Sequence, residues 1–128
     1  LNANFAIGNF ISNVLNGEKI EIRGNEKTIR SYLHASDLAF IVIKMLSSPS
    51  SDPINLGSES QVSMKGLAEQ ISSIFCRSDG YIIENKTFAS YYVPSTTKAV
   101  SLYGKFDLVD FQKGLRDWYE WLIMTRKI

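Results

Sequence analysis

The N-terminal segment carries apolar residues at helical spacing. They recur every three or four positions between Phe5 and Leu15, which places them on one face of a helix. These residues are Ile7, Phe10, Ile11, Val14 and Leu15. Asn4 can cap this helix and Gly17 can end it. The next stretch, "KIEIR" (19–23), alternates apolar and polar positions and predicts a short half-buried strand.

The middle of the chain continues with turns, short extended runs and two helices. "GNEK" (24–27) is a polar turn, and "SYLHA" (31–35) is predicted to be extended. Ser36 and Asp37 can cap a helix, and Ser63 can cap a second one. Between these helices, "INLG" (54–57) predicts a short strand that ends in a glycine turn. The apolar side of the first helix carries Leu38, Ile41, Val42, Met45 and Leu46, and that of the second carries Met64, Leu67, Ala68, Ile71, Ile74 and Phe75.

The C-terminal third predicts one strand and two helices. "YIIE" (81–84) is a short strand, and residues 85–95 are irregular. A helix from about Thr96 to Tyr103 stops at Gly104. The last helix begins near Asp107 or Asp110. Its apolar face holds Leu108, Phe111, Leu115, Trp118 and Leu122.

Strands and helices that alternate in this way predict an α/β fold with about five helices and few short strands. No strand leads into a Gly-rich phosphate loop that opens a helix. The set of strands is therefore too small for a complete nucleotide-binding sheet.

Composition excludes several classes of protein. The chain has 128 residues, a net charge of +1 and one cysteine, so we expect no binding of nucleic acid or of membrane surfaces through bulk charge, and no disulfide or cysteine-based zinc site. These features favour a cytoplasmic setting. The chain does not begin with methionine, and we expect it to be a piece of a longer chain or a processed form.

Few side chains suggest chemistry by themselves. His34 is the only histidine, and a structural role in the extended stretch is the simpler interpretation. Asp37 is more simply a charge at a helix terminus than a base. Cys76 ends an apolar helical face, which favours a buried thiol. We therefore assign no catalytic residue, cofactor ligand or metal ligand.

Arg30 stands between a polar turn and an extended run. An arginine fixed there can offer a rigid fork of donors to a phosphate. From spacing alone, a surface arginine paired with Glu26 or Asp37 is the simpler alternative. Arg23 can lie nearby, and two arginines across one turn would suit a diphosphate. Tyr91 and Tyr92 can stack on a ring, although such residues more often pack a loop.

Four segments, taken in order, resemble the C-terminal part of extended short-chain dehydrogenases/reductases, the NAD-dependent sugar-nucleotide epimerases and dehydratases. They are "FAIGNFISNVLNGEKIEIRG" (5–24), "TIRSYLHASDLA" (28–39), "INLGSESQVSMKGLAEQI" (54–71), and "YVPSTTKAVSLYG" (92–104) followed by "GLRDWYEW" (114–121). Each segment alone is a weak signal, but the ordered set covers nearly the whole chain.

The resemblance implies a site for a nucleoside-diphosphate sugar. The family's matching arginine binds the substrate diphosphate, which gives this role to Arg30. The segment from Glu21 to Arg23 matches the backbone beside the nucleobase, and Ala6 matches the helix entry that borders the nucleotide. Asn55 matches an asparagine near the substrate pocket.

This chain also departs from the family. Many relatives carry a second arginine before the closing helices, where this chain reads "ASYYVPST" (89–96). Tyr92 or a main-chain group is then the expected substitute. The family's Gly-rich dinucleotide loop and its catalytic Tyr-x-x-x-Lys pair are also missing.

The resemblance thus implies that residues 1–128 are the nucleotide-sugar-binding portion of a longer enzyme, which binds NAD through an N-terminal Rossmann lobe absent here. Alone, the chain is expected to bind no NAD and to be inactive. Two alternatives stay open: a free-standing, non-catalytic nucleotide-sugar-binding protein, and a nucleic-acid or protein-interaction module. The sequence fixes neither the sugar nor the base, nor whether the reaction is an epimerisation, a dehydration or a decarboxylation.

The missing lobe implies an uncovered surface. In the family, the "INLG" stretch and the helix that begins at Leu38 pack against the dinucleotide-binding lobe. Without that lobe, the residues expected to be exposed are Ile41, Val42, Ile54 and Leu56. Large apolar patches tend to bind a partner, so we expect the chain alone to associate as a closed homodimer.

Overall fold

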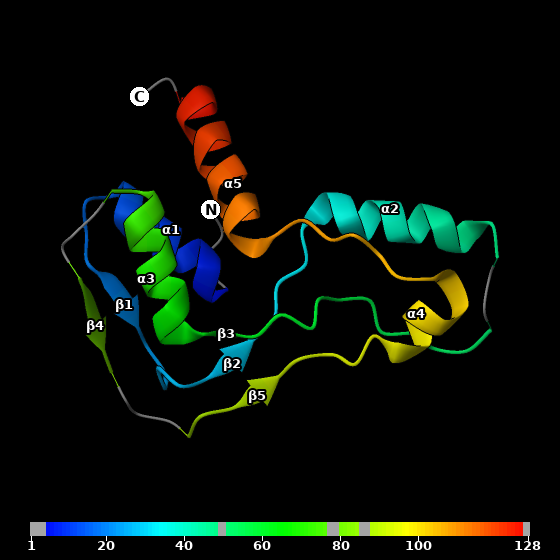
Figure 1. The fold of residues 1–128 in the computed structure, drawn as a ribbon. Coiled ribbons are helices and arrows are strands. Elements are labelled where there is room, and N and C mark those ends of the chain that lie inside the picture. The colour runs from blue at the N-terminus through cyan, green and yellow to red at the C-terminus, as the bar shows by residue number, and fades with distance from the viewer. Residues whose placement is uncertain (1–4, 49–50, 77–79, 85–87, 127–128) are drawn as a thin grey trace.

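The computed structural model describes residues 5–48, 51–76, 80–84 and 88–126. At one end of the molecule, α1 (Ala6–Leu15), α3 (Met64–Ile74) and α5 (Phe111–Arg126) lie together (Figure 1). At the other end are α2 (Ala35–Leu46) and α4 (Thr97–Tyr103). Short strands run along the edge and through the middle.

Two small sheets organise the strands. In the first, β1 (Ile20–Ile22) pairs in parallel with β4 (Tyr81–Ile83). In the second, β2 (Ile29–Arg30) is the central strand. It pairs antiparallel with β3 (Val62–Ser63) and parallel with β5 (Tyr91–Tyr92). Arg30 is therefore held by partners on both sides, opposite Val62 and Tyr92.

The core lies where α1, α3 and α5 pack around β1. The predicted apolar faces of the three helices supply most of it, and the alternation of "KIEIR" turns Ile20 and Ile22 inward. The buried residues of this cluster are Phe10, Ile11, Val14, Ile20, Ile22, Val62, Met64, Leu67, Ala68, Ile71, Phe75, Leu115 and Leu122. The predicted α/β class, with few short strands and five helices among the described residues, is confirmed.

The predicted helix caps are only partly correct. Ser63 caps α3 as expected, because its Oγ accepts a hydrogen bond from Gly66 N at 2.9 Å. The cap of α2 is His34 and not Ser36 or Asp37: its Nδ1 accepts from Ser36 N at 3.3 Å, so the helix begins earlier than predicted. Asp37 lies in the first turn of α2, and its carboxylate accepts from Val109 N at 2.9 Å. The expected cap of α1, Asn4, lies outside the described residues.

Three further local predictions were wrong. "INLG" forms no strand. Its backbone lies against the loop before α4, where a Cβ built on Gly57 would come within 2.5 Å of Pro94 Cγ, so the glycine serves a close approach of two segments. The pair Tyr91–Tyr92 forms a short strand that the irregular prediction missed. Cys76 is exposed, at a positive φ of 52° just beyond α3, and is not buried.

The helix α2 differs from the others because most of its apolar side chains are exposed. Only Ile41 is buried, which corrects the expectation that it is exposed. Val42 is exposed as expected, whereas Ile54 and Leu56 are half-buried. Ile43 and Leu46 have 67% and 76% of their surface exposed. No described helix has the length and hydropathy needed to cross a bilayer.

A substitution at Leu67 tests where the core lies. It is fully buried on α3, whereas Leu102 on α4 is half-exposed. We expect Leu67→Ala to lower the free energy of unfolding by about 2–5 kcal/mol, because it leaves a cavity in the core. Leu102→Ala should change it by about 0.5 kcal/mol or less. Urea unfolding followed by tryptophan fluorescence measures both values. Equal losses would contradict this packing.

Candidate functional site

A cleft of about 290 Å³ opens beside β2, between the start of α1 and the segment that leads into β5. It brings together three of the residues predicted from the sequence: Ala6, Arg23 and Arg30. The other residues that line it are Asn9, Phe10, Ile22, Gly24, Asn25, Thr28, Met64, Phe88 and Ser90. Apart from the two arginines, no charged residue of the described chain lines this cleft.

Arg30 contributes a half-buried cation to the cleft. Its Nη1 donates to Ile29 O at 2.8 Å and to Ser90 O at 3.4 Å, and its Nη2 donates to Ser90 Oγ at 2.9 Å. All of these acceptors are neutral. Among the described residues no carboxylate pairs with Arg30, so the predicted alternative of pairing with Glu26 or Asp37 is wrong. A partly desolvated cation without a counter-ion favours the binding of an anion.

Arg23 stands at the open rim of the same cleft. Its Nε and Nη2 both lie 2.8 Å from Glu21 Oε2. Glu21 does not itself line the cleft, but it orients Arg23 along the rim. The Arg23 side chain is 74% exposed, so this ion pair contributes little to stability.

The two remaining predicted residues lie outside the cleft. The side-chain amide of Asn55 donates to Ser95 O at 3.5 Å, in the segment that follows β5. Tyr92 is exposed and does not line the cleft, although it is paired with Arg30 across the sheet. Sequence reasoning missed Thr28 and Ser90. They lie close together because β2 pairs with the segment before β5. No local pattern in the sequence indicates that pairing.

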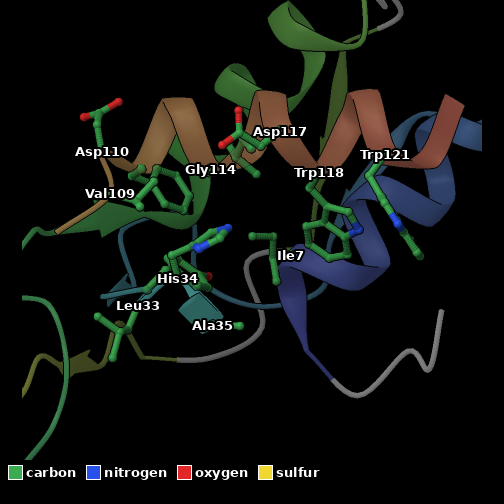
Figure 2. A pocket seen from close by; sticks show the side chains of 13 residues that line it. Ile7, Leu33, His34, Ala35, Val109, Asp110, Gly114, Asp117, Trp118 and Trp121 are labelled. Carbon is green, nitrogen blue, oxygen red and sulfur yellow. The ribbon is translucent and has the colours of Figure 1, made fainter. Parts of the chain in front are cut away.

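A larger cleft of about 480 Å³ lies between α1, the segment 32–35 and α5. Figure 2 shows Trp118 and Trp121 of α5 on one side of it, with Ile7 and His34 facing them. None of the six predicted site residues lines it. Its walls are mostly apolar and aromatic, so its size alone does not make it a reactive site.

The polar groups of this larger cleft already serve the fold. His34 caps α2, Asp110 Oδ1 accepts from Lys113 N at 3.1 Å, and Asp117 pairs with Lys113 Nζ at 2.7 Å. Burial raises the pKa of Tyr32, and the nearby charge of Arg30 offsets part of that rise. Tyr32 therefore stays protonated at neutral pH and is not available as a base. We interpret this cleft as a packing surface.

The chain is similar to known proteins both in sequence and in fold. The model of the NAD dependent epimerase/dehydratase family matches residues 3–57. Among curated proteins, UDP-glucuronic acid decarboxylase 1 of Danio rerio is 26% identical over 117 residues, which are 90% of this chain and 28% of the relative. The same enzyme of Xenopus tropicalis matches with the same identity and coverage. The chain thus spans little more than a quarter of these relatives.

Solved structures share the fold at low identity. An epimerase from Methanothermobacter thermautotrophicus superposes with a TM-score of 0.87 and 20% identity, over 97% of this chain and 38% of the neighbour. A UDP-N-acetylglucosamine 4-epimerase from Methanobrevibacter ruminantium, in complex with UDP-N-acetylmuramic acid, superposes with a TM-score of 0.80 and 22% identity. The match covers 98% of this chain and 41% of the neighbour. A UDP-glucose 4-epimerase from Thermotoga maritima, with UDP-glucose, superposes with a TM-score of 0.83 and 17% identity. The match covers 95% of this chain and 40% of the neighbour.

The predicted resemblance to the NAD-dependent epimerase/dehydratase family is confirmed. The sequence match covers the part of the chain that includes Ala6, Glu21, Arg23, Arg30 and Asn55. The structural match extends over nearly all of the chain.

NAD, which the family implies, does not fit the residues present in this chain. The described strands are two or three residues long and form sheets of two and three strands. No strand of the described residues opens into a Gly-rich turn and helix, and none of the eight glycines has another glycine two positions away. No tyrosine is followed four positions later by lysine. Among the described residues, no group of three histidine, cysteine, aspartate or glutamate side chains could hold a metal ion.

Proposed function

We propose that this chain is the nucleotide-sugar-binding portion of a longer NAD-dependent sugar-nucleotide epimerase or dehydratase, and that Arg30 binds the substrate diphosphate. One observation carries the proposal. The half-buried guanidinium of Arg30 has only neutral acceptors in the described chain, and it lies in a cleft shared with Ala6 and Arg23.

The chemistry of the cleft matches a nucleoside diphosphate. Arg30 supplies positive charge, and its fork of donors suits phosphate oxygens. Arg23, paired with Glu21, adds a second guanidinium at the rim. The exposed Phe88 adds aromatic surface, and Asn9 adds an amide that can recognise the polar edge of a base. The named ligands of the structural neighbours, such as UDP-glucose, support this class of substrate.

The coverage of the relatives supports the division into two parts. The chain spans 28% of the decarboxylases and about 40% of the structural neighbours. We assign NAD binding and the catalytic tyrosine and lysine to the remainder of the enzyme. This chain binds and orients the sugar nucleotide. The relatives include decarboxylases and epimerases, and the proposal extends to this range of reactions. The cytoplasmic location stays a prediction.

The exposed apolar residues of α2 support the same division. Leu38, Phe40, Ile43 and Leu46 are exposed along one helix, and apolar surface costs about 25 cal/mol per Å² when it stays in water. We propose that the dinucleotide-binding part of the enzyme covers this surface. The predicted homodimer would then form only when that part is absent.

The first prediction concerns Arg30 in the full-length enzyme. Arg30→Ala should weaken nucleotide-sugar binding by about 1.5–3 kcal/mol, the range for hydrogen bonds to charged groups. Arg30→Lys should recover only part of this loss, because a point charge cannot make a two-pronged contact. NAD binding should stay unchanged. Isothermal titration calorimetry measures both affinities.

Arg116→Ala is the matched control, because Arg116 is exposed on α5 and does not line the Arg30 cleft. If Arg30→Ala binds the nucleotide sugar as tightly as the unsubstituted enzyme, Arg30 does not bind the diphosphate and the proposal fails.

The second prediction concerns residues 1–128 alone. This fragment should show no NAD binding by calorimetry and no turnover of any sugar nucleotide, because it has neither a dinucleotide loop nor a catalytic Tyr/Lys pair. Stoichiometric NAD binding at micromolar concentration would contradict the division of the enzyme.

The third prediction concerns the uncovered side of α2. Residues 1–128 alone should form dimers at high micromolar concentration in sedimentation equilibrium, and Ile43→Lys should shift the equilibrium toward monomer because it places a charge on the exposed side. Leu102→Lys on α4 is the control and should leave the equilibrium unchanged. A fragment that stays monomeric over the whole concentration range would refute this assignment of the surface.

A further inference from the structure

We infer that Ser90 is a positioning residue for Arg30, and that its hydroxyl turns one edge of the guanidinium toward the substrate diphosphate. The inference rests on the proposed function, because it takes Arg30 as the diphosphate ligand. It adds a residue that the family resemblance did not indicate, and it specifies which donors of Arg30 bind the phosphates.

The backbone N–H and C=O of Ser90 are both hydrogen-bonded to the start of β2 and the residue before it. Ser90 N donates to Thr28 Oγ1 at 3.3 Å, and Ser90 O accepts from Ile29 N at 2.9 Å. Thr28 is itself buried. The position of the Ser90 Cβ is therefore set by the sheet, and the hydroxyl reaches Arg30 from a fixed point.

The contacts of Arg30 occupy one end of its guanidinium. A guanidinium has five N–H donors. Nη1 donates to Ile29 O and Ser90 O, and Nη2 donates to Ser90 Oγ. These contacts leave the N–H of Nε and the second N–H of Nη2, and no acceptor of the described chain is bonded to either. The two remaining donors lie on the same edge of the planar group.

That edge is a two-pronged donor that matches two phosphate oxygens. Ser90 holds the other end of the guanidinium in place. This contact lowers the free-energy cost of binding, because a guanidinium that is free to rotate loses conformational entropy when it binds. Tyr92, the substitute expected from the sequence, is exposed and outside the cleft. Ser90, two residues earlier, lines the cleft and contacts Arg30 directly.

The Ser90 hydroxyl is uncharged, which also suits this role. A neutral acceptor orients the guanidinium and leaves its positive charge for the ligand, whereas a carboxylate at the same place would neutralise it. Ser90→Asp should therefore weaken binding more than Ser90→Ala, although aspartate keeps an acceptor beside Arg30. A purely structural role for Ser90 predicts no such order.

The test uses the full-length protein and calorimetry with UDP, dTDP, CDP and GDP as separate probes, continued with the one that binds most tightly. Ser90→Ala should raise its Kd about three- to tenfold, the effect of one hydrogen bond. Ser90→Thr, which keeps the hydroxyl, should stay within about twofold of the unsubstituted protein. Ser101→Ala on α4 is the matched control and should change nothing. Melting temperatures of all variants show whether each one folds.

A double-mutant cycle with Arg30→Ala decides the mechanism. If Ser90 acts through Arg30, Ser90→Ala adds less than about twofold to the Kd of Arg30→Ala. An equal effect in both backgrounds overturns the inference, because Ser90 then acts independently of Arg30. If Arg30→Ala weakens binding but Ser90→Ala does not, the inference fails and the proposed function stands. If none of the four probes binds, or Arg30→Ala has no effect, both fail.

Discussion

The site depends on the position of Arg30 in the central strand of a three-stranded sheet. β2 is only two residues long, and β3 and β5 pair with it on either side. These pairings hold the Arg30 backbone, and the Ile29 and Ser90 acceptors hold its guanidinium. A cation fixed in this way is partly desolvated and lacks a carboxylate partner in the described chain, which makes a diphosphate a favourable ligand. The neighbouring Arg23 is kept at the rim by Glu21.

The sequence predicted the helices and the core well because helical periodicity is a local signal. The faces of α1, α3 and α5 form the core as expected, and Ser63 caps α3. Two of the errors fall where distant segments meet. "INLG" was read as a strand from its composition, but its glycine serves a close approach to Pro94. The strand β5 exists only because it pairs with β2, and no pattern in "YY" shows this.

The same distinction between local signals and long-range contacts explains which site residues were predicted. The family resemblance selected Arg30, Arg23 and Ala6, and the structure places all three in one cleft. Ser90 and Thr28 were missed because Ser90 bonds to Arg30 and to Thr28 across sixty or more positions along the chain. The exposure of α2 was predicted only in part. Val42 is exposed as expected, but Ile41 is buried, and the exposed Phe40 and Ile43 were not among the predicted residues.

A crystal structure of the full-length enzyme with its nucleoside diphosphate would test the central claim most directly. The account predicts two phosphate oxygens at about 2.7–2.9 Å from Nε and Nη2 of Arg30, the usual length of charge-assisted hydrogen bonds. Ser90 Oγ should keep its contact with Nη2 in the complex. A diphosphate bound elsewhere, with Arg30 contacting only Ile29 and Ser90, would contradict the account.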